Sequence, residues 1–134
     1  MNWLLDTNII SFLLRGRPEV RTRYDALKSE ADMGFVLSPV VDYEIRRYLL
    51  LKGATRNLAQ YETLILDWDK PLFDQAHWAH SATLWAERHR LGRPIEDADL
   101  LIAVTAIQKN SVLVTNNTLH FKDLGLRLED WSRP

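Results

Sequence analysis

Three carboxylates in one short stretch are the strongest sign of chemistry in this chain of 134 residues. Glu96, Asp97 and Asp99 open a segment that is otherwise apolar from Leu100 to Ile107, which predicts a helix buried on most sides. A helix N-terminus favours a carboxylate by about 0.3–1 kcal/mol, which explains one of the three, most simply Asp97 as the N-cap. A divalent cation explains all three, because hard cations take oxygen ligands and hold clustered carboxylates ionised.

Two more carboxylates lie where they could join this cluster. Asp6 follows Trp3-Leu4-Leu5, a predicted buried strand, and ligands in open α/β sheets gather at the carboxyl ends of strands. A helix N-cap is an equally good interpretation of Asp6 from these residues alone. Glu44 lies among apolar neighbours in a predicted helix, either as a catalytic carboxylate beside Arg47 or as half of an ordinary i,i+3 ion pair.

The elements that must position these groups alternate between strand and helix. Apolar runs bounded by turn residues predict strands over 3–5, 34–37, 66–69, 112–114 and 126–128. Helices are predicted over about 9–14, 18–31, 38–53, 55–66, 73–91 and 97–107, with a short helical turn near Phe121. We therefore expect a single α/β domain over residues 1–134, with three α/β/α layers and a mostly parallel sheet of about four or five strands flanked by helices.

Other side chains could also bind a ligand or a metal, but a structural role explains them more simply. The arginines at 15, 17, 21 and 23 indicate either a solvated face, the commoner case, or a rim that faces phosphate. Trp78 and Trp85 share a helix face, which favours core or interface over a base-stacking platform. His77 and His80 lack a third ligand at helical spacing, so we expect no metal there.

The composition limits the class of protein. Lys and Arg (17) nearly balance Asp and Glu (18) and the sequence pI is about 6.4, which argues against a wholesale nucleic-acid binder but allows a nuclease with a local basic rim. There is no cysteine, which fits a reducing compartment. No basic leader precedes the first apolar run and no segment approaches about 18 consecutive apolar residues, so we expect a soluble cytoplasmic protein without a membrane partner.

The four main carboxylates predict a common site. In a parallel three-layer fold, Asp6, Glu44, Asp97 and Asp99 can converge on one edge, and four ionised groups so close cannot all stay charged alone. One or two Mg²⁺ or Mn²⁺ ions would resolve the repulsion, activate water and stabilise in-line attack on a phosphodiester.

Four sequence blocks, in this order and spacing, carry a family resemblance. They are LLDTNIISFLLRGRP, SPVVDYEIRRYLL, GRPIEDADLLIAVTA and LVTNNTLHFKDLGLRLEDW, and they are spread over nearly the whole chain. With them the chain resembles a PIN-domain ribonuclease of the VapC type, the toxin half of a type II toxin–antitoxin pair. The resemblance implies a Mg²⁺-dependent endoribonuclease, with Mn²⁺ as a substitute, that inhibits translation unless a VapB-like antitoxin neutralises it.

The resemblance also implies roles for the acidic residues. Asp6 and Asp99 match the principal metal pair, Glu44 binds a metal or orients the attacking water, and Asp97 supports a second ion or a bridging water. Asn117 stands where many members have aspartate, which removes one ligand from a second ion. Other toxins of this type carry the same asparagine, so we still expect activity.

Further residues and partners follow from the same resemblance. Supporting hydrogen bonds are expected from Thr7, Asn116 and Asn117, and contacts to the RNA backbone from Arg15, Arg17 and Arg47. The antitoxin would cover the groove between the early helices and place a basic side chain in the acidic cluster. A two-fold homodimer would use the Trp78/Trp85 helix or the Tyr61 to Leu66 helix, and structured RNA, often tRNA, is the implied substrate.

Two other functions are alternatives to a metal-dependent ribonuclease. A haloacid-dehalogenase-like phosphatase needs a second aspartate two positions after Asp6, and that position is Asn8. A PIN-like module that binds RNA or protein without cutting would be favoured by loss of Asp6 or Asp99, and both are present.

Overall fold

A four-stranded parallel sheet forms the centre of the computed structural model, which describes all residues from 1 to 134. Its strands are β1 (Asn2–Leu5), β2 (Gly34–Val36), β3 (Ser111–Val114) and β4 (Leu128–Glu129), in the order β2-β1-β3-β4. Leu5 of β1 pairs with Val114 of β3, so the residues that follow these two strands leave the sheet side by side. The predicted parallel α/β fold is confirmed.

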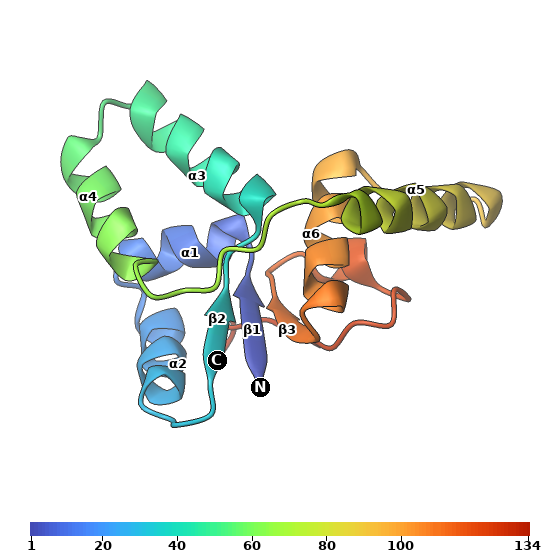
Figure 1. Cartoon of the computed structure of the whole chain (residues 1–134). Helices are drawn as coiled ribbons and strands as arrows, with labels where there is room; N and C mark the ends of the chain where they lie inside the picture. The colour runs from blue at the N-terminus through green and yellow to red at the C-terminus, as the bar shows by residue number, and fades with distance from the viewer.

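Six helices flank the sheet in Figure 1, with α1 to α4 on the left and α5 and α6 on the right. Their bounds are α1 (Thr7–Leu14), α2 (Pro18–Lys28), α3 (Pro39–Leu51), α4 (Thr55–Leu64), α5 (Gln75–Arg90) and α6 (Asp97–Gln108), and a 3-10 turn, η1 (Thr118–Phe121), follows β3. The chain moves from β1 to β2 in one direction along the sheet and from β2 to β3 in the other. Because such crossovers are right-handed, the helices α1 and α2, which follow β1, and the helix α6, which leads into β3, cover opposite faces of the sheet. The helices α3 and α4 pack against α1. No helix has the length and apolar character needed to cross a membrane.

Local sequence explains where the helices begin. Asp6 caps α1, Ser38 caps α3 ahead of Pro39, and Asp74 caps α5, each by accepting a hydrogen bond from a backbone N–H in the first turn. The helix α6 is different, because Glu96 is its N-cap residue and makes no side-chain capping bond. The expectation that Asp97 is the N-cap is therefore wrong: Asp97 is the first helical residue.

One predicted strand is absent. Residues 66–69 form a turn whose only strand-like contact is a single bridge between Val36 and Asp69. Trp68 is buried there and donates its indole N–H to the hydroxyl of Tyr24, 3.2 Å away. The apolar character of this segment thus reflects one buried aromatic side chain, since a short apolar run cannot by itself distinguish strand from turn.

The remaining differences concern boundaries. The last strand covers 128–129 where 126–128 was predicted, α1 begins at Thr7, two residues early, and α2 and α4 end earlier than predicted, at Lys28 and Leu64. The helix α5 begins at Gln75 because Asp74 caps it, where the apolar pattern had suggested Phe73.

Candidate active site

The candidate site lies beyond the carboxyl ends of β1 and β3. The connection from β1 leads to β2 and that from β3 leads to β4, on opposite sides, so the crevice between them is the topological switch point at which open α/β sheets bind ligands. The backbone N–H of Asp6 donates to the carbonyl of Val114, 2.9 Å away. Asp6 and Thr115 therefore emerge together at this crevice.

Asp6 is held in one orientation by two hydrogen bonds. One carboxylate oxygen accepts from the backbone N–H of Thr7, and the other accepts from the hydroxyl of buried Thr115, both at 2.8 Å. Asp6 is 7% exposed and serves as the N-cap of α1. Capping does not exclude metal binding, because a carboxylate has about four lone-pair sites and these bonds use two.

Neighbouring charges oppose the ionised form of Asp6. Burial raises the pKa of Asp6, and the carboxylates of Asp99 and Glu44 raise it further, against the hydrogen bonds from Thr115 and Thr7, which lower it. Three acidic side chains from α3, α6 and the end of β1 therefore act on one another across the crevice. A cation would relieve the repulsion.

Asp99, in the first turn of α6, lies in a similar environment. Burial raises the pKa of Asp99, with Glu96 and Glu44 adding to the rise, while His120 opposes it. The ring Nδ1 of His120 is 3.1 Å from a carboxylate oxygen of Asp99. Asp99 thus has one cationic or hydrogen-bonding neighbour from η1 and two acidic ones.

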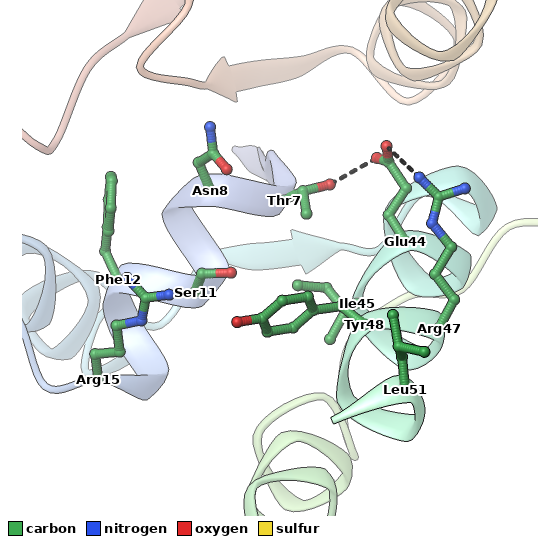
Figure 2. Close-up of a pocket in the computed structure, with 10 residues that line it drawn as sticks. All are labelled: Thr7, Asn8, Ser11, Phe12, Arg15, Glu44, Ile45, Arg47, Tyr48 and Leu51. Carbon is green, nitrogen blue, oxygen red and sulfur yellow. Dashed lines mark hydrogen bonds and ion pairs between the residues drawn. The ribbon is translucent and has the colours of Figure 1, made fainter. Parts of the chain in front are cut away.

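Glu44 joins the cluster through α1. One of its carboxylate oxygens accepts from the Thr7 hydroxyl at 2.8 Å, and the other is 3.9 Å from the guanidinium of Arg47 (Figure 2). The i,i+3 pair with Arg47 is thus present but long, with the Arg47 side chain 58% exposed. Consecutive residues, Asp6 and Thr7, connect Glu44 to the end of β1.

The other predicted residues border this cluster more loosely. Asp97 is exposed at the start of α6. Asn116 accepts a hydrogen bond from the Asn8 side chain at 3.2 Å, across the crevice between β3 and α1. Asn117 is exposed, and its backbone N–H donates to the Thr115 hydroxyl at 3.0 Å.

The donor set fits a cation that keeps much of its water shell. No three His, Asp or Glu side chains are arranged around one point as a complete ligand group. Mg²⁺ is usually bound through one or two carboxylates, several waters and substrate phosphates, so a pair such as Asp6 and Asp99 suffices. The residues present fit this mode.

A groove of about 750 Å³ leads away from the cluster between α1 and α3 (Figure 2). Thr7 and Glu44 line the end that meets the cluster, and the rest is lined by apolar side chains, including Phe12 and Leu51, and by polar ones such as Ser11. Arg15 and Arg47 also line the groove, which therefore combines apolar side chains with two cationic groups. Its acidic end and basic walls suit an extended ligand of mixed character.

Arg17 does not line the groove itself, although it covers Phe12, which does. It donates to the backbone carbonyl of Ser132 at 3.0 Å, pairs with Glu19 at 3.5 Å and covers the ring of Phe12. The structure thus brings Arg15 and Arg47 to the groove and ties Arg17 to the C-terminal segment.

Sequence reasoning did not single out two contributors, Thr115 and His120. The only sequence signal for Thr115 was its place directly after an apolar strand, next to the asparagines that were chosen instead. His120 had no local signal, because its partner Asp99 is 21 residues away on another element.

The tryptophan pair and His77, all on α5, differ in burial. Trp78 and Trp85 are 52% and 44% exposed, so neither belongs to the core, and their exposure is compatible with both an interface and a base-stacking platform. His77 is buried, and its Nε2 is 2.9 Å from the Thr105 hydroxyl of α6. In the Tyr61 to Leu66 segment, Tyr61 is fully buried and donates a hydrogen bond to Asp42, whereas Leu66 is 78% exposed.

Comparison with known proteins places the chain in a family. The PIN domain model matches residues 3–125. The chain is 33% identical to the tRNA(fMet)-specific endonuclease VapC of Shigella flexneri, covering 98% of this chain and 99% of that protein. It is 29% identical to Ribonuclease VapC1 of Haemophilus influenzae strain R2866, covering 99% and 100%.

Solved structures agree. VapBC2 from Rickettsia felis, bound to a DNA fragment from its promoter, matches with a TM-score of 0.86 and 26% identity over 98% of this chain and 99% of the other. DNA-bound VapBC from Salmonella typhimurium matches with a TM-score of 0.78 and 30% identity over 98% of each chain. With a carboxylate cluster at the switch point of a parallel sheet, and these matches along its whole length, the chain belongs to the VapC family of PIN-domain proteins.

Proposed function

We propose that this chain is a VapC-type toxin, an endoribonuclease that hydrolyses RNA phosphodiester bonds with Mg²⁺ and accepts Mn²⁺ in its place. The observation that carries the proposal is the convergence of three carboxylates, Asp6, Asp99 and Glu44, at the switch point, where burial and neighbouring carboxylates raise the pKa of Asp6 and of Asp99. The relatives named as ribonucleases support the choice of RNA.

The ion-binding residues have distinct tasks in this proposal. Asp6 and Asp99 would hold the ion, with Asp97 adding a ligand or a water-mediated contact. When bound, the ion would act as a Lewis acid and lower the pKa of a bound water. Thr115 and the Thr7 backbone keep the Asp6 carboxylate from rotating, which preserves its orientation toward the ligand.

Glu44 and its neighbours would manage the attacking water and the phosphate. The Thr7 hydroxyl fixes one oxygen of Glu44 and leaves the second free to orient a water or bind metal. Arg47, 3.9 Å from that second oxygen, supplies positive charge for a phosphate in the groove. Asn116, held by Asn8, and Asn117 can donate further hydrogen bonds to phosphate or ligands.

Partners follow from the groove and from α5. A VapB-like antitoxin is the proposed occupant of the groove, with a basic side chain beside Glu44 in place of the cation. The structural neighbours are VapBC complexes, which supports such a partner. We also propose a homodimer through the exposed Trp78 and Trp85 of α5, and action in the cytoplasm, where translation takes place.

The RNA class is proposed to be tRNA, because relatives are named as tRNA(fMet)-specific endonucleases. The test incubates the antitoxin-free chain with initiator tRNA, other tRNAs and a mixed RNA pool, in Mg²⁺ and in EDTA. The expected result is metal-dependent cleavage by the native chain and none by the variant Asp99→Asn. Equal cleavage by this variant would refute the metal assignment, and binding of RNA without cleavage would favour a non-catalytic module.

A further inference from the structure

A second hollow, of about 280 Å³, also borders the carboxylate cluster. It shares no residue with the groove: the groove reaches the cluster through Glu44, and the hollow reaches it through Asp99. The end of α5, the loop before α6, the first turn of α6 and η1 together form its walls. An RNA chain whose scissile bond lies at the cluster has to continue in two directions, and the groove provides for one of them.

Arg88 places a buried guanidinium in this hollow, whose lining also includes the carboxylates of Glu96 and Asp99. The Arg88 side chain lines the hollow and is 9% exposed. Its guanidinium donates only to backbone carbonyls, those of Arg93 at 2.9 Å and Lys122 at 3.3 Å, and forms no ion pair, whereas the neighbouring Arg93 pairs with Asp123 at 3.0 Å. Burying a charge without a paired opposite charge is unfavourable, so a phosphate within reach of the guanidinium would stabilise Arg88. A cation at the cluster would offset the repulsion of that phosphate by Asp99 and Glu96.

Apolar side chains also line the hollow. Leu119 is 80% exposed on η1, and Pro94 and buried Ile95 complete the surface next to the imidazole of His120. Nucleobases stack on flat or apolar side chains while cations hold the backbone. The volume is close to the lower end of about 300–1,000 Å³ for small-ligand sites, which suits one nucleotide.

We propose that the hollow is the subsite for the nucleotide adjoining the cleaved bond, with Arg88 facing its phosphate and Leu119 contacting its base. This subsite rests on the proposed function, because it assumes that RNA is cut at the cluster. It divides the substrate between the groove, with Arg15 and Arg47, and the hollow. The shape of the hollow then contributes to the choice of cleavage site.

The exposed wall offers a substitution that folding tolerates. Leu119→Asp places a negative charge where the base would lie, and Leu72→Asp is the matched control, since Leu72 is 86% exposed and lines neither cavity. We expect Leu119→Asp to lower kcat/KM for RNA at least tenfold and to shift the preferred cleavage site. The control should match the native chain, and all three proteins should bind Mn²⁺ equally.

A binding experiment separates this subsite from the proposed function. The probes are the four ribonucleoside monophosphates in Mg²⁺, compared with the unphosphorylated nucleosides, and the readout is amide chemical shifts of residues 118–121. Monophosphates should shift these resonances in the native chain. Arg88→Lys should keep these shifts. Arg88→Met should lose the shifts caused by monophosphates, while its response to the unphosphorylated nucleosides should match that of the native chain.

The outcomes are distinct. If the native chain cuts RNA and Leu119→Asp cuts it equally well at the same positions, with no shifts from monophosphates, the subsite is refuted and the proposed function stands. If the native chain cuts no RNA while monophosphates still shift residues 118–121, the nucleotide site stands and the proposed function fails.

Discussion

Two buried polar sites in this chain differ in how burial affects their ionisable side chains. Asp6 is 7% exposed at the carboxyl end of β1, beside two other carboxylates, and burial and those charges raise its pKa. His77 is 2% exposed between α5 and α6, and burial lowers its pKa. Burial thus favours the neutral form of the histidine, which needs no counter-charge. The carboxylates repel one another unless a cation binds among them.

Hydrogen bonding at His77 completes the contrast. The Thr105 hydroxyl donates to the carbonyl of Leu101 at 3.0 Å, so it accepts from Nε2 of His77 at 2.9 Å. This assignment puts the proton on Nε2 and leaves Nδ1 buried without a hydrogen-bond partner. This pair fastens α5 to α6 with neutral groups, while the cluster around Asp6 is built for a charged ligand.

The largest expected effect is on catalysis. Asp99→Asn should lower RNA cleavage by about 1,000-fold, because a metal supplies several kcal/mol of transition-state stabilisation and each 1.36 kcal/mol is about tenfold in rate. The same variant should raise the Tm of the metal-free protein by a few degrees, because it removes a repelling charge. Thr105→Val at the other site should keep the native rate, so a large loss there would break the contrast.

The second effect is stabilisation by metal. Mg²⁺ at about 100 times its Kd should raise the free energy of unfolding of the native chain by about 2.7 kcal/mol. Calorimetry with and without Mg²⁺ measures this directly. Asp99→Asn should lose most of the increase and Thr105→Val should retain it, and an equal increase in all three proteins would place the ion elsewhere.

A third prediction concerns stability at the neutral site. Thr105→Val leaves the Nε2–H of His77 without an acceptor, which should reduce the free energy of unfolding by about 1–3 kcal/mol. Urea denaturation measures the loss. A variant as stable as the native chain would show that His77 finds another partner or turns its ring.

The smallest effect is a difference in the sign of pH dependence. Because the folded-state pKa values of Asp6 and Asp99 are raised, their contribution to stability is greatest below the ordinary aspartate pKa of about 3.9 and is lost as pH rises through the raised values. The pKa of His77 is lowered, so its contribution is present above about 6.5 and is lost as pH falls.

Metal-free urea denaturation across this range checks the signs. The stability advantage of Asp99→Asn over the native chain should grow from acid to neutral pH. A His77→Gln variant should remove part of the loss seen below about pH 6.5. A constant advantage of Asp99→Asn at every pH would contradict the raised pKa of Asp99.

Much of the fold was predictable because its signals are local. The apolar run before Asp6 and the cap residues Ser38 and Asp74 lie within a few residues of the elements that they start. The false strand at 66–69 had the same kind of signal, and the burial of Trp68 on Tyr24, far away in sequence, explains it. A local apolar pattern therefore predicts a strand or helix well only when its apolar residues are buried because they belong to that strand or helix.

The site was predicted in its acidic residues but not in their supports. Carboxylates in an apolar segment are unusual enough to be noticed, whereas the Thr115 hydroxyl reaches Asp6 from 109 residues away. Arg17 was expected at the RNA backbone together with Arg15 and Arg47, and in the structure its guanidinium donates to the carbonyl of Ser132, 115 residues along the chain. A run of arginines in the sequence does not reveal which of their side chains already have hydrogen-bond partners in the folded chain.

The most direct test of the metal site is a crystal structure of the native chain soaked in Mn²⁺, with anomalous scattering to locate the ion. Our account predicts one peak at the carboxyl ends of β1 and β3, with oxygens of Asp6 and Asp99 both within about 2.0–2.6 Å or bridged to the ion by one water. The account is contradicted if no ion binds there, or if the ion binds with Asp6 and Asp99 both outside its ligand and water shells.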